Sequence, residues 1–382
     1  MNNQALVDLA PLARLMGMGV LLALGPLAWV WLRNTGAAAG RRTQVLTLLT
    51  LFLTFDLVLF GAFTRLTDSG LGCPDWPGCY GKASPLGASA EIAAAQSAMP
   101  SGPVTHGKAW VEMVHRYLAT GVGVLILTLA IASWLKRRRG GSTAGVSPWW
   151  PTLTLVWVCL QGAFGALTVT MKLFPAIVTL HLLGGLGLLA LLCAQAVRQQ
   201  QAGQGGAVEA LAPGLRSGLW LTAALVLLQV TLGGWVSTNY AVLACSDFPM
   251  CQRSWWPAMN FAQGFQIWRP LGHTGAGAPI DFAALTAIHY VHRLAAYAVL
   301  AALGLLAWQL LRAGVLRAQA RWLAALAAWQ LVTGLSNIVL GWPLLAAVAH
   351  TGGAAALVVV LTWALAASRT APHRITASRS PA

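Results

Sequence analysis

The chain has 382 residues, of which 57% are hydrophobic and only 9% are charged, and its formal net charge is +15. A soluble domain has about 25% charged residues, so this composition excludes a water-soluble enzyme. The 24 Lys and Arg residues lie in short clusters between apolar stretches, which indicates membrane topology and argues against nucleic-acid binding.

Apolar runs predict nine helices that are long enough to cross the hydrocarbon core of a bilayer. In chain order they cover residues 13–33, 44–65, 109–135, 149–171, 175–198, 216–238, 283–311, 320–341 and 344–366. We therefore predict an all-α integral membrane protein.

The basic clusters predict the orientation, because Lys and Arg gather on the cytoplasmic side. Nine alternating spans put all of these clusters on one side: Arg41 with Arg42, residues 136–139, Arg198 with Arg216, Arg312 with Arg317 and Arg321, and the tail from Arg369 to Arg379. The N-terminus is then outside and the C-terminus is cytoplasmic. In the first run the positive charges follow the apolar core, whereas in a signal peptide they precede it, so we expect a retained helix.

An internal repeat divides the chain into two halves. Three anchors recur in the same order: Cys73-Pro-Asp-Trp-Pro-Gly-Cys79 and Cys245-Ser-Asp-Phe-Pro-Met-Cys251; Glu112-Met-Val-His115-Arg116 and His289-Tyr-Val-His292-Arg293; and Gln161 before His181 and Gln330 before His350. Both units begin on the cytoplasmic side, so we predict two parallel-repeat four-helix bundles plus one extra N-terminal helix. The predicted parts are the extra helix at 1–43, the first half at 44–198, a linker at 199–215, the second half at 216–366 and a basic tail at 367–382.

Four histidines lie inside predicted spans at repeated positions: His115, His181, His292 and His350. A single membrane histidine is often a packing residue, but ionisable groups repeated in this way indicate sites. They lie at similar depths, about 9 Å inside the outer end of a span for three of them. Zinc would need further Cys or carboxylate ligands, which are absent at this depth. Haem needs only one or two axial ligands and an apolar slot, so we predict a bis-histidine haem pocket in each half. Small residues following two of these histidines would let a macrocycle approach the backbone: Gly184, Gly185, Gly352 and Gly353.

Charged residues flank these histidines. Arg116 and Arg293 are expected either to neutralise haem propionates or to extend to the lipid headgroups. Glu112 lies one helical turn before its histidine, which suits proton transfer, although an ion pair with Arg116 is a structural alternative. The second half has His289 at that place, so we interpret it as an electron-holding or structural copy. Asp56, also inside a span, is expected to bond to neighbouring helices or to take part in proton movement.

Four cysteines form two close pairs in outward-facing loops. Thiols outside the cytoplasm are oxidised, so disulfides Cys73–Cys79 and Cys245–Cys251 are predicted. Each disulfide either staples its loop over the site or, for Cys73–Cys79, passes electrons near it.

The chain resembles the haem A synthase family. The segment Gly61-Ala-Phe-Thr-Arg-Leu-Thr-Asp-Ser-Gly-Leu-Gly-Cys-Pro-Asp-Trp-Pro-Gly-Cys79 is similar to that family's first outer loop, and Glu112-x-x-His115-Arg116 is similar to its Glu-x-x-His element. The similarity covers residues 44 to 366. Members have eight helices, so the helix at 13–33 is a departure.

The resemblance implies oxidation of the C8 methyl of haem O to a formyl group in two steps, through an alcohol and a geminal diol, giving haem A. It implies that His115 and His181 are axial ligands of the substrate haem O, and that His292 and His350 are those of a haem B cofactor. Glu112 would then face the porphyrin edge, accept protons and stabilise positive charge.

The resemblance also implies partners: the farnesyltransferase that makes haem O, and cytochrome oxidase assembly factors. A bacterial inner membrane is expected because no transit peptide is visible. A homo-oligomer is also possible. Two other functions remain as alternatives. A dihaem b-type carrier exchanging electrons with quinone explains the four histidines but not Glu112, and a haem transporter or chaperone would hold haem loosely.

Overall fold

The structure is a computed structural model that describes residues 10–36, 39–140, 146–204 and 208–371. Within these residues nine helices are long and apolar enough to cross a membrane, which confirms the all-α membrane fold and the predicted spans. They are α1 (Ala10–Arg33), α2 (Ala39–Leu66), α4 (His106–Arg138), α5 (Trp149–Thr170), α6 (Pro175–Gln204), α7 (Pro213–Thr238), α9 (Phe282–Ala313), α10 (Arg317–Val339) and α11 (Leu344–Ala366). Most of them extend past the predicted ends, because polar and basic residues continue the helix beyond its apolar stretch.

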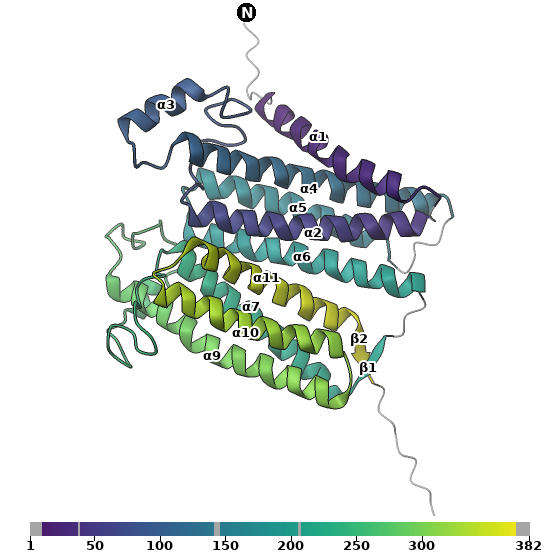
Figure 1. The fold of residues 1–382 in the computed structure, drawn as a ribbon. Helices are drawn as coiled ribbons and strands as arrows, with labels where there is room; N and C mark the ends of the chain where they lie inside the picture. The colour runs from purple at the N-terminus through teal and green to yellow at the C-terminus, as the bar shows by residue number, and fades with distance from the viewer. Residues whose placement is uncertain (1–9, 37–38, 141–145, 205–207, 372–382) are drawn as a thin grey trace, which may run out of the picture.

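The spanning helices form two groups of four, with α1 outside both (Figure 1). Helices α2, α4, α5 and α6 pack together in the first half, and α7, α9, α10 and α11 pack together in the second. Helices α6 and α11 join the halves, since α6 contacts α7 and α11, and α11 also contacts α2. The helices follow the same chain order in each half, which agrees with the parallel repeat seen in the sequence.

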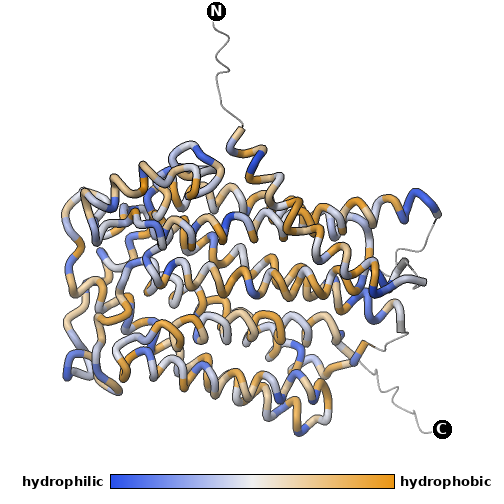
Figure 2. Tube along the Cα trace, turned by 45° about the horizontal axis from the view of Figure 1, so that its top comes forward, coloured by the Kyte–Doolittle hydropathy of each residue, from blue (hydrophilic) through white to orange (hydrophobic). Residues whose placement is uncertain are grey.

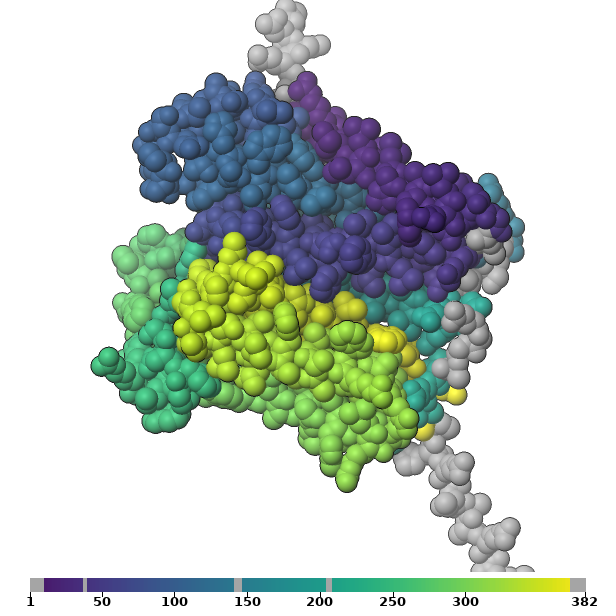
Figure 3. Space-filling view, viewed as in Figure 1, coloured from purple at the N-terminus to yellow at the C-terminus, as the bar shows by residue number. Residues whose placement is uncertain are grey.

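The extra helix α1 packs along α4 and lies against the first half (Figures 1 and 3). One stripe of α1 is buried there, including Leu15, Gly19, Ala23 and Val30. At Gly19 a Cβ atom would lie only 2.3 Å from Cγ2 of Thr120, so a residue without a side chain is needed for this close approach.

Hydrophilic residues gather toward the two ends of the helices, and the stretch between is mostly hydrophobic (Figure 2). One end carries the two long loops that hold the cysteine pairs. Within them are two short helices, α3 (Ser89–Ala98) and α8 (Phe261–Gly264), which we did not predict. The alanine-rich sequence of α3 favours a helix, so this signal was present in the sequence.

The opposite end is basic and aromatic. Five arginines lie over tryptophan rings there: Arg42 over Trp31, Arg137 over Trp134, Arg198 over Trp150, Arg216 over Trp220 and Arg312 over Trp308. Trp and Arg together are typical of the cytoplasmic membrane surface. Residues 372–382 of the predicted basic tail lie outside the described residues.

The linker at 199–215 is more ordered than predicted. Helices α6 and α7 extend into it, and between them β1 (Glu209–Leu211) pairs in parallel with β2 (Ser368–Thr370). The carboxylate of Glu209 also accepts a 3.0 Å hydrogen bond from the main-chain N–H of Leu316, just before α10. These bonds connect the described part of the segment to the second half, and its role as a linker between the halves stays a prediction. The predicted domain boundaries stay a prediction.

Asp56 lies in α2 with an exposed side chain, and none of the described residues forms a hydrogen bond with it. The expectation that Asp56 bonds to neighbouring helices is therefore wrong. The buried threonines of α2 behave differently, because the hydroxyls of Thr50 and Thr54 donate to main-chain carbonyls four residues earlier.

Candidate functional site

The four intramembrane histidines come from α4, α6, α9 and α11, and each packs against a glycine of a neighbouring helix. A Cβ atom on each glycine would lie 3.0 to 3.4 Å from the imidazole. The contacts are Gly61 with His115, Gly165 with His181, Gly233 with His292, and Gly334 with His350. His115 interacts electrostatically with His181, and His292 with His350. The structure therefore brings the histidines together as one pair in each half.

Side chains of neighbouring helices support the pair in the second half. The hydroxyl of Thr333 donates to the carbonyl of Trp329 at 2.7 Å, and its oxygen lies 2.9 Å from Nδ1 of His350. Because that hydroxyl proton is already used, the oxygen accepts the Nδ1 proton and the lone pair of Nε2 stays available for a metal. The amide nitrogen of Gln229 lies 3.1 Å from Nδ1 of His292 and also donates to the main-chain carbonyl of His292 at 3.1 Å, while its Oε1 is buried without a partner among the described residues. Because an amide nitrogen is a donor, this contact orients the ring but does not accept an Nδ1 proton as Thr333 does.

The first half has apolar residues at both of these supporting positions. Leu57 stands where the second half has Gln229, and Phe164 stands where it has Thr333. This equivalence follows from the glycines, because each residue keeps its spacing to the glycine that contacts the histidine. Nδ1 of His181 is accordingly buried with no hydrogen-bond partner in the described part of the chain.

The ring of His115 also differs from its counterpart in the second half. It stacks on Phe60 with ring centroids 6.2 Å apart, and its Nε2 is the ring atom nearest to Gly61. Among the described residues, neither imidazole of the first pair has a side-chain acceptor like the Thr333 oxygen at His350.

Above the first pair, Arg116 and Glu112 form a buried hub that holds the disulfide loop. The guanidinium forms an ion pair with Glu112, and the other carboxylate oxygen accepts a 2.8 Å hydrogen bond from the main-chain N–H of Cys73. Arg116 also donates to three loop carbonyls at 2.6 to 3.1 Å, those of Asp75, Pro77 and Gly78. Only 4% of Glu112 and 9% of Arg116 is exposed. The structural alternative considered for Glu112, an ion pair with Arg116, is therefore present.

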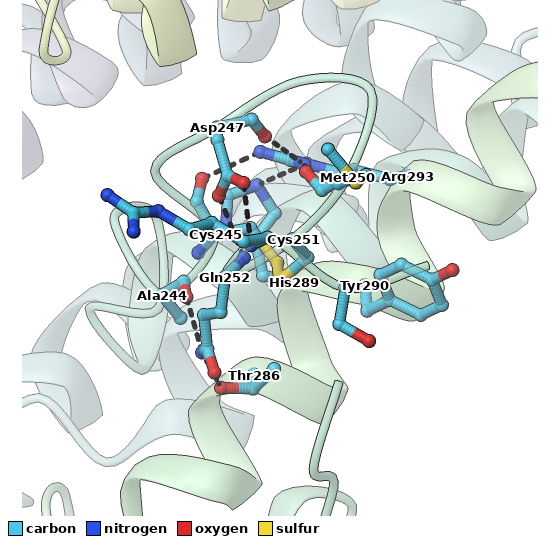
Figure 4. The surroundings of a disulfide bond; sticks show 12 residues. Ala244, Cys245, Asp247, Met250, Cys251, Gln252, Thr286, His289, Tyr290 and Arg293 are labelled. Carbon is cyan, nitrogen blue, oxygen red and sulfur yellow. Dashed lines mark hydrogen bonds between the residues drawn. A yellow bond between two sulfur atoms is a disulfide. The ribbon is translucent and has the colours of Figure 1, made fainter. Parts of the chain in front are cut away.

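The second half repeats this hub with His289 in place of the glutamate (Figure 4). Nδ1 of His289 faces the main-chain N–H of Cys245, and its Nε2 faces Nε of Arg293, both at 3.3 Å. Arg293 donates to three loop carbonyls at 2.6 to 3.1 Å, those of Cys245, Asp247 and Met250. His289 is thus a structural counterpart of Glu112 in a loop that is held in the same way.

Both predicted disulfides are present, Cys73–Cys79 and Cys245–Cys251. In each loop an aspartate binds two main-chain N–H groups beyond the second cysteine, as Asp247 does with Gln252 and Arg253 at 2.7 and 2.8 Å. The hydrogen bond from Arg253, together with that from Gln252, holds the pKa of the Asp247 carboxyl below its ordinary value. The geometry of the disulfides agrees with a role as loop staples.

Comparison with known proteins gives the family. A sequence model described as "Cytochrome oxidase assembly protein" matches residues 44–362. A haem A synthase of Shewanella oneidensis is 38% identical over 82% of this chain and 92% of its own length. The chain belongs to the haem A synthase family. Haem A synthases of Symbiobacterium thermophilum and a Methylobacterium species are each 32% identical, over 77% and 78% of this chain and 85% and 84% of their own lengths.

The residues fit the iron porphyrin that the haem A synthase family implies. Each half offers two imidazoles that each pack against a glycine, and Thr333 accepts the Nδ1 proton of His350, which leaves the Nε2 lone pair of His350 free. Among the described residues no group of three or more His, Cys, Asp or Glu side chains could hold a bare metal ion.

The arginines have other partners than those expected. Both guanidiniums are buried against loop carbonyls, so the interpretation that they extend to lipid headgroups is wrong. Nothing in the structure tests whether Arg116 and Arg293 also neutralise propionates, which stays a prediction.

The expected small residues around the macrocycle are not the ones that contact the histidines. A Cβ on Gly184, Gly352 or Gly353 would collide with side chains of neighbouring helices, because these glycines serve helix packing. The residues that do contact the imidazoles include Gly61 and Gly233, whose role we did not predict. The signal was available, since each stands twelve residues before the first cysteine of its half.

Proposed function

We propose that the chain is a haem A synthase whose second half retains a haem B cofactor and whose first half binds haem O as substrate. It is a membrane oxidoreductase that converts haem O to haem A. The observation that supports the division between halves is the hydroxyl oxygen of Thr333, which accepts from Nδ1 of His350 in the second half and is replaced by the apolar Phe164 in the first. Partners of iron-binding histidines strengthen metal affinity about 10- to 100-fold, so the better supported pair suits a group that stays bound.

The residues of the first half then act on a substrate that must enter and leave. His115 and His181 would hold the porphyrin through its iron, and the absence of a hydrogen-bond partner at Nδ1 of His181 among the described residues suits exchange. The reaction oxidises the C8 methyl to a formyl group in two steps, which together remove four electrons and four protons and add one oxygen atom, formally from water. A bound haem B would carry the electrons onward to an external acceptor.

Glu112 supplies a fixed negative charge at the outer edge of this site. Arg116 and the main-chain N–H of Cys73 hold its carboxylate in one orientation. We propose that this carboxylate stabilises positive charge as the methyl group is oxidised and accepts the proton released. The Cys73–Cys79 disulfide holds the loop that provides the N–H group.

The proposed setting is a bacterial inner membrane with the N-terminus outside and the C-terminus in the cytoplasm. The basic and aromatic end of the bundle supports this orientation. The haem O-producing farnesyltransferase, oxidase assembly factors and a second copy of the chain are proposed partners on family grounds alone.

Expression in a host that makes haem O, followed by chromatography of the extracted haems, tests this function. We expect formyl-bearing haem A, and we expect Glu112→Gln to retain haem but to make little haem A. Extraction of unmodified haem B alone would favour the dihaem carrier, and loosely held haem that leaves without turnover would favour a transporter. Unchanged haem A yield from Glu112→Gln would remove the role given to the carboxylate.

A further inference from the structure

The two halves differ by one buried charge at equivalent positions. Glu112 and His289 each lie one helical turn before a histidine of the site, and each contacts the first cysteine of the loop and the neighbouring arginine. Glu112 is a carboxylate paired with Arg116. His289 carries no positive charge in this geometry, because its Nε2 faces the Nε–H of Arg293 and an imidazolium has no lone pair to accept that hydrogen bond. A neutral ring has one lone pair, so it accepts from only one of its two N–H neighbours, Arg293 or Cys245.

The other charged groups of the two hubs match. Each hub has one buried arginine, and each loop has one aspartate, Asp75 or Asp247, whose carboxylate binds two main-chain N–H groups. The hub in the second half is therefore more positive by one unit. His289 is 5% exposed and Arg293 is 7% exposed, so water screens this difference poorly.

We propose that this charge difference gives the haem of the second half the higher reduction potential, so that it accepts electrons from the haem site of the first half. Nearby positive charge favours ferrous over ferric iron, because the ferric form carries one more positive charge. In the transfer step one electron passes from ferrous iron in the first half to ferric iron in the second, and no proton needs to move. This inference rests on the proposed function only in requiring that each histidine pair binds haem.

Redox titration of the full-length protein in nanodiscs, followed by absorbance, tests the inference. Changing His115 and His181 to Ala leaves only the haem of the second half. In that background, His289→Glu gives the second half the carboxylate that Glu112 provides in the first. We expect His289→Glu to lower the midpoint potential of this haem. His289→Gln, which changes shape without adding charge, should shift it much less.

The reciprocal variant keeps the test decisive if His289→Glu loses haem. With His292 and His350 changed to Ala, Glu112→Gln removes the carboxylate at nearly constant shape, and we expect it to raise the potential of the first haem. Equal effects of His289→Glu and His289→Gln, or no rise with Glu112→Gln, would overturn the inference. Loss of haem from both His289→Glu and Glu112→Gln would also overturn the inference, because the side chain at this position would then be needed for haem binding and not for setting the potential.

These outcomes separate the inference from the proposed function. If neither half binds haem, the proposed function fails. If both halves bind haem and haem A is formed, but the midpoint potentials do not change in the charge variants, only the inference fails.

Discussion

Thr333→Val tests whether polar support of the second histidine pair retains its haem. Valine has nearly the shape of threonine, so the change removes the oxygen 2.9 Å from Nδ1 of His350 without opening a large cavity. One hydrogen bond contributes about 0.5–1.5 kcal/mol, and loss of a partner of a metal-binding histidine typically weakens binding about 10-fold or more. At about 1.4 kcal/mol for each factor of ten, these figures agree on a loss near 1.4 kcal/mol. We expect haem to leave the second half about tenfold faster.

The assay follows transfer of haem from the purified protein to an excess of an apoprotein that binds haem tightly. Thr222→Val is the matched control, because Thr222 is also buried in a helix of the second half but its hydroxyl bonds only to the carbonyl of Gly218 at 2.9 Å. The control should release haem at the parent rate. Equal rates for Thr333→Val and the parent would refute the argument that this hydroxyl prepares the second pair for a permanent haem.

Two further outcomes follow from contacts near the site. Gly233→Ala places a Cβ 3.0 Å from the ring of His292, so we expect an altered haem spectrum and a stability loss of about 1–3 kcal/mol, whereas Gly304→Ala, with no neighbour within 4 Å, should leave both unchanged. For Asp247, main-chain hydrogen bonds from Arg253 lower the pKa of the carboxyl from 3.8, so its contribution to loop stability is present above that pH and is lost as pH falls through the lower folded value. Asp247→Asn should therefore speed reduction of the Cys245–Cys251 disulfide by a phosphine at neutral pH, but not at pH values below the folded pKa of Asp247. Thiol labelling measures the rate of reduction. Equal rates for the variant and the parent at neutral pH would contradict this prediction.

The fold could be predicted because a bilayer allows few solutions. Backbone groups in hydrocarbon must bond within the segment, so an apolar run of about 20 residues can only become a helix. The repeat then predicted the pairing of His115 with His181 and of His292 with His350, since equivalent residues on equivalent helices occupy equivalent places. The structure places the two imidazoles of each half near each other, and their role as a ligand pair for haem stays a prediction.

The contacts of the loop hubs could not be predicted in the same way. Hydrogen bonds from Arg116 to carbonyls of residues about 40 positions away depend on the path of the loop, and sequence spacing carries no record of it. The same holds for Glu112, whose partner Cys73 is 39 residues earlier. Helical periodicity predicted only the contact of Glu112 with Arg116, four residues later. The sequence alone therefore could not decide whether Glu112 transfers protons or forms an ion pair.

The duplication also shows where chemistry was able to diverge. The glycine contacts of the histidines, the arginine and the disulfide loop recur in both halves, although the ring of His115 is oriented differently from that of His292. This shared frame supports the proposal that each half binds a similar group. The differences fall on the contacts around that shared frame: apolar residues replace Gln229 and Thr333, and Glu112 replaces His289. Each difference acts in the same sense, because loss of polar support eases exchange and an added carboxylate favours the more positive, oxidised state. A half that releases its porphyrin and stabilises positive charge is suited to a substrate, and a half that retains it is suited to a cofactor.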